Sequence, residues 1–171
     1  MDYAVFLRAV NVGGTGKLPM VDLKAMCENA GFLNVQTYIA SGNIVLSTHE
    51  PLGYVHLELE QRLEAFVGKA VGVMVRTLPE LEQVIADNPF AKKESKKSAV
   101  IFLPEKTRPE MLEESRCRSD ELLSLGEREI YVYFPQGMGR SRLTLPAAKL
   151  GTTRNMNTVR KLRDMLAEYS S

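Results

Sequence analysis

The sequence is poor in the residues that most often carry catalytic or metal-binding chemistry. It holds two cysteines, two histidines and no tryptophan in 171 residues. Cys27 and Cys117 have no second thiol or histidine at metal-ligand spacing, and neither C-x-x-C nor H-E-x-x-H occurs. We therefore expect no disulfide framework, no metal and no cofactor. Both cysteines fall at apolar positions of predicted helices, which predicts that they are small buried hydrophobic residues.

Long apolar runs and a strong excess of one charge are also missing. No stretch approaches the ~20 apolar residues that a membrane-spanning helix needs. The net charge is +1, so the overall charge favours neither nucleic acid nor a membrane as partner. The lack of a signal peptide and of a cysteine pattern predicts a cytoplasmic protein with no membrane contact. The oligomeric state is left open.

What the sequence does contain predicts an α+β fold that begins with a β-α-β-β-α-β lobe. In some segments apolar residues recur every three to four positions, as in a helix, and other segments are short apolar runs typical of strands. Ser41-Gly42-Asn43 marks a hairpin turn between two such runs. Strands are expected at 2–10, 35–40, 44–47 and 71–76, and helices at 19–31 and 52–68. This order is the ferredoxin-like arrangement, in which two helices cover one face of a four-stranded antiparallel sheet.

Residues 77–171 predict a second, smaller α+β lobe, so we divide the chain into domains 1–76 and 77–171. Thr77 and Glu80 have the spacing of a capping box and predict a helix that stops at Asn88-Pro89. The remaining expected elements are a strand at 100–103, a helix from Thr107, a hairpin of 122–125 with 130–134, and two final helices at 141–150 and 155–169.

Five segments together resemble one known family. They are FLRAVNVGGTGKLPM, TYIASGNIVLS, NPF, GMGRS and GTTRNMNTVRKL, in this order along the chain. They resemble the domain of unknown function 1697 family, which implies a ferredoxin-like first domain followed by a second α+β domain. The resemblance implies no activity and no catalytic residues. The family usually has glycine where this chain has Ala9, which predicts that the backbone there needs no glycine-only conformation.

A glycine-rich loop, NVGGTGK, follows the first strand from Asn11 to Lys17. A phosphate-binding loop needs G-x-x-x-x-G-K-[ST], but here the glycine spacing differs and Leu18 stands at the hydroxyl position. Two interpretations therefore stay open. The loop is a plain connection with positive φ, or a looser anion site in which Lys17 lies beside a helix start.

Two further glycine-led segments, Gly137–Arg142 and Gly151–Asn155, are expected as loops that lead into helix starts. Seven basic residues and no acidic one lie between Gly137 and Arg163. They are Arg140, Arg142, Lys149, Arg154, Arg160, Lys161 and Arg163. Helix starts and guanidinium groups both attract phosphate or carboxylate. A small anionic ligand, a nucleic-acid backbone, or pairing with the eight acids between Glu105 and Glu129 would each account for the pattern.

Catalytic and base-stacking interpretations find little support. His49 and His56 have no serine or cysteine motif beside them. Tyr131 and Tyr133 share a strand face, where packing is a more ordinary role than stacking on RNA bases.

The sequence therefore predicts a protein that binds a phosphate-bearing ligand or a nucleic-acid backbone through its Gly/Arg-rich loops. The candidate binding residues are Arg8, Asn11, Gly13, Gly14, Lys17, Arg140, Ser141, Arg154 and Asn155. Two other functions remain open: an enzyme of unknown reaction with a site between the lobes, and a protein-interaction module that uses an exposed strand edge.

Overall fold

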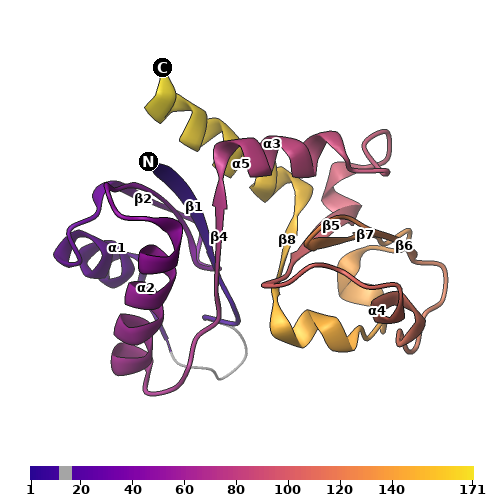
Figure 1. Ribbon diagram of the computed structural model, residues 1–171. Coiled ribbons are helices and arrows are strands. Elements are labelled where there is room, and N and C mark those ends of the chain that lie inside the picture. The colour runs from indigo at the N-terminus through magenta and orange to yellow at the C-terminus, as the bar shows by residue number, and fades with distance from the viewer. Residues whose placement is uncertain (12–16) are drawn as a thin grey trace. The chain divides into compact units, whose positions relative to one another are not determined.

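The computed structural model describes residues 1–11 and 17–171, which form two compact units (Figure 1). The first unit comprises Met1–Glu80 and Leu162–Ser171, and the second comprises Leu81–Lys161. The sequence assigned all of 77–171 to the second domain, whereas the end of the chain clusters with the first unit. There the Tyr169 hydroxyl donates a hydrogen bond to the backbone carbonyl of Asn34.

The first unit contains the expected β-α-β-β-α-β fold. Its antiparallel sheet has the strand order β2-β3-β1-β4, which is ferredoxin-like. The strands are β1 (Asp2–Leu7), β2 (Leu33–Tyr38), β3 (Asn43–Ser47) and β4 (Val73–Thr77), and the helices are α1 (Met20–Asn29) and α2 (Leu52–Val67).

Both helices cover one face of this sheet (Figure 1). Val55, Leu59 and Leu63 recur every four residues along α2, so they form one buried stripe against the sheet. Leu23 and Cys27 do the same on α1. The fold thus follows from helices that are long enough to show their apolar period.

The backbone at one end of the first sheet adopts several left-handed conformations. Gly42 has φ 85° in the predicted hairpin turn, and its carbonyl accepts the Leu7 N–H at 2.8 Å. Ala9, Asn11 and Ile39 also have positive φ, at 53°, 55° and 50°. Ala9 thus adopts a left-handed conformation, which glycine enters at lower cost but which is not restricted to glycine.

The second unit contains another four-stranded antiparallel sheet, with order β6-β7-β5-β8. Numbered within each unit, both sheets have the order 2-3-1-4. The strands are β5 (Ser98–Phe102), β6 (Leu122–Leu125), β7 (Glu129–Tyr133) and β8 (Thr152–Asn155). The helix α4 (Glu110–Glu113) and the 3-10 helix Pro146–Leu150 stand at the chain positions that α1 and α2 occupy in the first unit. The second unit is therefore a shortened version of the first topology.

Several elements expected in residues 77–171 are confirmed. Thr77 and Glu80 exchange hydrogen bonds as a capping box at the start of α3 (Leu78–Ala86). β6 pairs with β7 as the predicted hairpin. The terminal helix is α5 (Met156–Ala167), followed by the 3-10 turn Glu168–Ser170.

Three local predictions in the second unit were wrong. Gly151–Asn155 is not a loop, because Thr152–Asn155 forms β8 and pairs with β5. The helix expected over 141–150 is only the 3-10 segment Pro146–Leu150. The helix expected from Thr107 is the single turn of α4.

In the described part of the chain no helix has the length and apolarity to cross a membrane.

Candidate functional site

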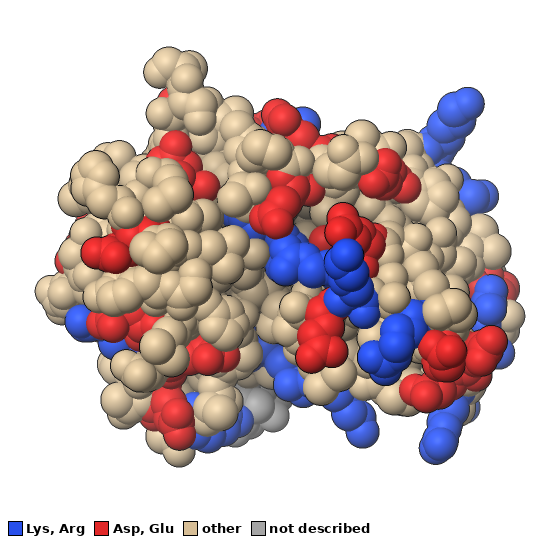
Figure 2. Space-filling model, in the orientation of Figure 1, with Lys and Arg blue, Asp and Glu red and all other residues tan. Residues whose placement is uncertain are grey.

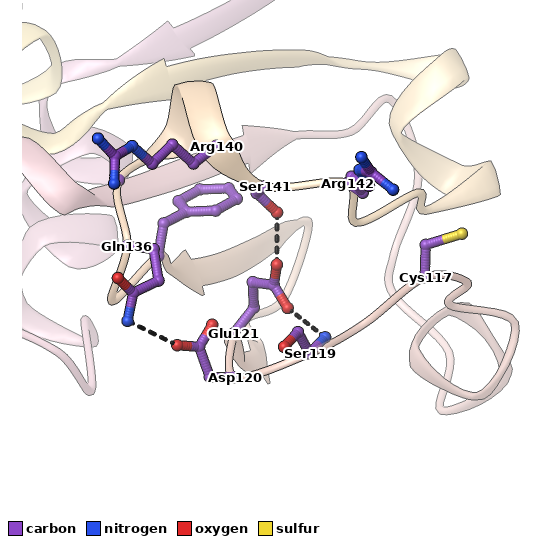
Figure 3. A pocket seen from close by; sticks show the side chains of 10 residues that line it. Cys117, Ser119, Asp120, Glu121, Gln136, Arg140, Ser141 and Arg142 are labelled. Atoms are coloured by element: carbon purple, nitrogen blue, oxygen red, sulfur yellow. Dashed lines mark hydrogen bonds between the residues drawn. The ribbon is translucent and has the colours of Figure 1, made fainter.

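A pocket of about 250 Å³ lies in the second unit, between the segment before β6 and the loop after β7 (Figure 3). We call it the Arg140 pocket. Its described lining consists of Cys117, Ser119, Asp120, Glu121, Phe134, Gln136, Gly137, Arg140, Ser141 and Arg142. It contains two of the predicted binding residues, Arg140 and Ser141, together with several that sequence reasoning did not single out.

Local backbone contacts hold the two walls of this pocket in place. Gly137 has φ 87° and donates its N–H to the Phe134 carbonyl at 2.9 Å, which turns the chain after β7. A one-turn 3-10 helix, Met138–Arg140, then presents Arg140 and Ser141. Arg116 and Thr144 exchange backbone hydrogen bonds of 2.8 and 2.9 Å, so the two walls are tied together beyond the pocket.

The Glu121 carboxylate forms the centre of the pocket wall. The residue is only 4% exposed, and its carboxylate oxygens accept the Ser141 hydroxyl and the Ser119 N–H, both at 2.6 Å. These bonds lower the pKa of Glu121, with the Ser141 hydroxyl as the largest cause. A carboxylate held in its ionised form is a weak proton acceptor, so Glu121 is poorly suited to activate Ser141 as a nucleophile. The pair is better suited to shape a binding pocket.

We expect Glu121 to make the protein less stable in acid. Its pKa is lowered in the folded state, so the unfolded chain binds more protons as the pH falls below the ordinary value of 4.5. The stabilising contribution is present above that pH and is lost as the pH falls through the folded-state pKa. Urea unfolding of the native protein and of Glu121→Gln between about pH 6 and about pH 3 measures this difference. Equal losses of stability in both proteins would contradict it.

Within the described part of the chain, neither Arg140 nor Arg142 makes an ion pair, although Asp120 and Glu121 line the same pocket. Asp120 instead accepts a hydrogen bond from Gln136 at 3.2 Å. Figure 3 shows Arg140 and Arg142 on either side of Ser141. Both arginines are exposed and free to meet a ligand.

The two cysteines have different environments, contrary to the prediction that both are buried. Cys27 is buried in α1, and burial raises the pKa of its thiol to about 12. Cys117 is exposed beside the Arg140 pocket, at φ 54°. The helix that would have buried it ends at Glu113.

We therefore expect one of the two thiols to react in the folded protein. A chromogenic disulfide reagent should release one equivalent rapidly from the native protein, and the second only after unfolding. Cys117→Ser should remove the rapid equivalent. Two rapid equivalents, or a rapid equivalent that survives in Cys117→Ser, would contradict this assignment.

A second pocket, of about 240 Å³, lies in the first unit between the end of β1 and the segment after α2. We call it the Arg8 pocket. Its described lining consists of Arg8, Ala9, Val10, Val67, Lys69, Ala70, Val71 and Gly72. The Arg8 N–H donates to the Gly72 carbonyl at 2.9 Å, and a Cβ on Gly72 would lie 3.1 Å from the Arg8 Cβ. A glycine thus lets the two segments approach closely.

The Arg8 pocket is basic. Arg8 and Lys69 come from different segments, and no acidic side chain is among the described lining residues. Within residues 1–11 and 17–171, neither side chain makes an ion pair. Lys69 is exposed and Arg8 is half-buried, so positive charge is available at the pocket surface.

Asn11 has a structural role beside this region. Its side-chain Nδ2 donates to the carbonyls of Leu18 and Ala40, both at 2.8 Å, and its Oδ1 accepts the Leu18 N–H at 2.7 Å. The side chain therefore joins the two ends of the glycine-rich segment and connects them to the hairpin turn. Lys17 is exposed. Gly13 and Gly14, which sequence analysis proposed for binding, lie outside the described residues.

Arg154 and Asn155 lie apart from the described lining of both pockets. Arg154 is 7% exposed on β8, and its Nη1 donates to the Thr152 hydroxyl at 2.7 Å and the Thr153 carbonyl at 2.9 Å. Burial lowers the pKa of Arg154 to about 10. Asn155 accepts the Thr158 N–H at 2.8 Å and caps α5. Arg154 and Arg140 therefore do not share a pocket among the described residues.

The two strand tyrosines pack within the second unit, as the sequence favoured. Tyr131 is buried, and its hydroxyl donates to the Val84 carbonyl at 2.7 Å. The ring of Tyr133 lies 6.1 Å from that of Phe90, with the Lys93 ammonium 5.0 Å from its centroid. Neither ring is presented as an open surface on which a base would stack.

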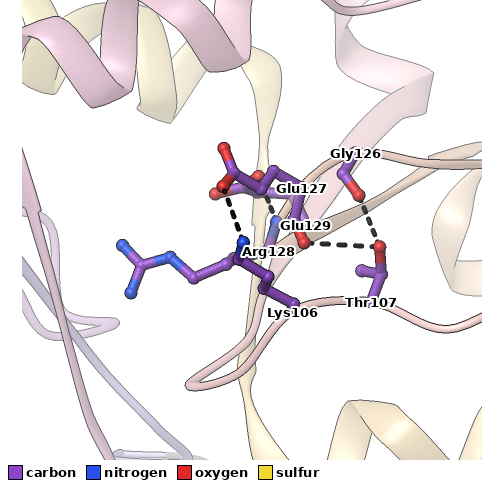
Figure 4. Close-up of polar contacts among 6 residues, drawn as sticks. All are labelled: Lys106, Thr107, Gly126, Glu127, Arg128 and Glu129. Atoms are coloured by element: carbon purple, nitrogen blue, oxygen red, sulfur yellow. Dashed lines mark hydrogen bonds and ion pairs between the residues drawn. The ribbon is translucent and has the colours of Figure 1, made fainter.

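A polar cluster at the β6–β7 turn is structural in character (Figure 4). The Thr107 hydroxyl donates to the carbonyls of Gly126 and Glu127, at 2.5 and 3.3 Å. The Lys106–Glu127 ion pair, at 3.8 Å, joins side chains that are 80% and 77% exposed, so it contributes little. The cluster fixes the hairpin against the segment after β5.

Charge on the face shown in Figure 2 is mixed rather than segregated. On the face in Figure 2, basic and acidic side chains alternate without one extended patch of either sign. The basic C-terminal residues also differ in their use. Arg154 is buried, whereas the Nε of Arg163 lies 2.6 Å from the Oδ1 of Asp164. Arg140 and Arg142 line a pocket. Among the described residues, no group of three or more His, Cys, Asp or Glu is arranged to hold a metal ion.

Comparison with known proteins gives a family and a fold. A family model described as a protein of unknown function (DUF1697) matches residues 1–131. A solved structure, that of a conserved bacterial protein from Streptococcus pneumoniae, is similar with a TM-score of 0.76 and 22% sequence identity. The similarity covers 96% of this chain and 98% of that chain, and at this identity it shows the fold alone. No curated protein matches the chain.

Proposed function

Because the chain belongs to the DUF1697 family, whose description gives no activity, we propose a function from its own side chains: it binds a small phosphate-bearing ligand in the Arg8 pocket. The observation that carries the proposal is that Arg8 and Lys69 line one pocket without an acidic neighbour among the described lining residues. Neither makes an ion pair within that part of the chain. Two such cations attract an anion that the protein itself does not supply.

The residue types fit phosphate better than other anions. A guanidinium group forms two parallel hydrogen bonds to phosphate oxygens, and a lysine ammonium adds a compact positive charge. The remaining described lining is alanine, valine and glycine, which lowers the local dielectric and strengthens these contacts. It offers no nucleophile and no general base, so binding rather than catalysis is proposed here.

A small ligand is favoured over a nucleic-acid backbone. The pocket volume of about 240 Å³ suits a phosphate with a small attached group. Nucleic acid needs several phosphate contacts along a continuous basic surface. On the face shown in Figure 2, acidic side chains interrupt the basic ones.

Calorimetric titration with glycerol 3-phosphate and with inorganic phosphate tests the proposal. We expect binding of glycerol 3-phosphate but not of glycerol. Arg8→Gln and Lys69→Gln should each weaken the binding about tenfold or more, because each removes a charge-assisted hydrogen bond. Lys24→Gln changes an exposed lysine of α1 outside the pocket and should bind normally.

Two results would contradict the proposal. One is the absence of binding by phosphate and by glycerol 3-phosphate at millimolar concentration. The other is binding that Arg8→Gln and Lys69→Gln weaken no more than Lys24→Gln does. Titration with single-stranded oligonucleotides at two salt concentrations distinguishes binding of a nucleic-acid backbone from binding of a small ligand. Affinity for a nucleic-acid backbone falls steeply as the salt concentration rises.

A further inference from the structure

The Arg140 pocket of the second unit differs from the Arg8 pocket in carrying both signs of charge. Arg140 and Arg142 contribute two positive charges, and Asp120 and Glu121 contribute two negative charges. No ion pair joins them within the described part of the chain. Opposite charges that line a pocket of about 250 Å³ without pairing are available to a ligand that carries both signs itself.

The two carboxylates of the pocket are not equivalent. Both oxygens of Glu121 are occupied, one by the Ser141 hydroxyl and one by the Ser119 N–H. Asp120 is exposed and accepts one hydrogen bond, from Gln136 to its Oδ2. Its Oδ1 has no hydrogen-bond partner in the described part of the chain. Asp120 is therefore the carboxylate that can meet a cationic group of a ligand.

We propose that the Arg140 pocket binds a small zwitterion that carries a carboxylate and an ammonium group, the class of free α-amino acids. The guanidinium group of Arg140, which lies on the same side of Ser141 as Gln136 and Asp120 in Figure 3, takes the carboxylate, since its paired N–H groups match the two oxygens. Asp120 takes the ammonium group. Gln136 holds Asp120 in position (Figure 3).

The charge of the lining favours a zwitterion over a phosphate. A phosphate dianion would meet the arginines but would also lie beside two carboxylates, which repel it. A zwitterion is electrically neutral overall, and each of its charged groups finds an opposite partner in the lining. This proposal uses residues of the second unit only, so it does not depend on phosphate binding in the first unit.

Thermal-shift screening with the free α-amino acids, followed by calorimetry on each amino acid that raises the melting temperature, tests this site. We expect at least one to bind. The matched amine without the carboxylate, and the matched acid without the ammonium group, should each bind about tenfold more weakly or worse. Arg140→Gln and Asp120→Asn should weaken binding to the same extent. Lys149→Gln, an exposed change outside the pocket, should not alter it.

The outcomes separate this site from the proposed function. If no amino acid binds, if the amine binds as tightly as the zwitterion, or if Asp120→Asn leaves affinity unchanged, the inference is wrong. Amino-acid binding that persists in Arg8→Gln supports it, because that variant removes only the phosphate site. Loss of phosphate binding in Arg8→Gln, with amino-acid binding intact, would support both proposals.

Discussion

Alanine in place of Gly151 is expected to destabilise the protein by about 3 kcal/mol, the largest single effect we predict. A Cβ at this position would lie 1.9 Å from the carbonyl oxygen of Phe102 and 2.9 Å from its carbonyl carbon. These are backbone atoms of β5, so no side-chain rotation can relieve the overlap. The strands must separate instead, which disturbs the pairing of Phe102 with Thr152 at the start of β8.

Urea unfolding measures this effect as a fall in the midpoint concentration. Gly139→Ala is the matched control. Apart from the backbone next to it, no described residue has an atom within 4 Å of a Cβ built on Gly139, and the Gly139 φ is not in the left-handed region. The stability of Gly139→Ala should therefore stay within about 0.5 kcal/mol of the native protein. Equal midpoints for the Gly151 and Gly139 variants would show that β8 does not approach β5 in this way.

The first unit is predictable because its elements are long. Val55, Leu59 and Leu63 repeat over a 16-residue helix, so the period is visible in the sequence alone. The Ser41-Gly42-Asn43 turn is equally clear, and Gly42 has the positive φ that such a turn requires. Four strands and two helices in a β-α-β-β-α-β order then leave few arrangements besides the ferredoxin-like one.

The same strand order in the second unit is difficult to predict from the sequence because the helices between its strands are short. α4 has four residues, which is one turn and too little to show a helical period. Gly151 to Asn155 contains glycine and asparagine, which favour loops in isolation. Pairing with β5 overrides that preference and makes Thr152–Asn155 a strand. Long-range pairing of this kind leaves no local signal in a single sequence.

The Arg140 pocket was only half predictable for a related reason. Arg140 and Ser141 belong to a visible Gly/Arg segment, but Glu121, the hydrogen-bond partner of Ser141, lies 20 residues earlier than Ser141 in the chain. The only sequence feature that pointed to Glu121 was the acidic stretch from Glu105 to Glu129. Sequence analysis gave these acids as possible ion-pair partners of the basic residues between Gly137 and Arg163. Asp120 and Glu121 do line the pocket, yet they make hydrogen bonds to uncharged groups rather than ion pairs with the arginines. Spacing along the chain could not show that distinction.

The last prediction concerns Asn11, which sequence analysis assigned to ligand binding. Asn11→Ala is expected to destabilise the protein by about 2 kcal/mol, since the side chain makes three hydrogen bonds worth about 1 kcal/mol each at most positions. They bind the N–H and carbonyl of Leu18 and the carbonyl of Ala40. Alanine would also keep the left-handed φ of 55° without the local stabilisation that asparagine brings.

Comparison with Asn11→Gly separates the two causes of this loss. Glycine removes the same hydrogen bonds but adopts φ 55° without strain, so Asn11→Gly should be less destabilised than Asn11→Ala in urea unfolding. A side chain that served only a ligand would leave the stability of Asn11→Gly at the native value while phosphate binding fell. The expected order of midpoints is native, then glycine, then alanine. That order would show that Asn11 stabilises the segment that follows β1, and with it the Arg8 pocket, rather than contacting an anion.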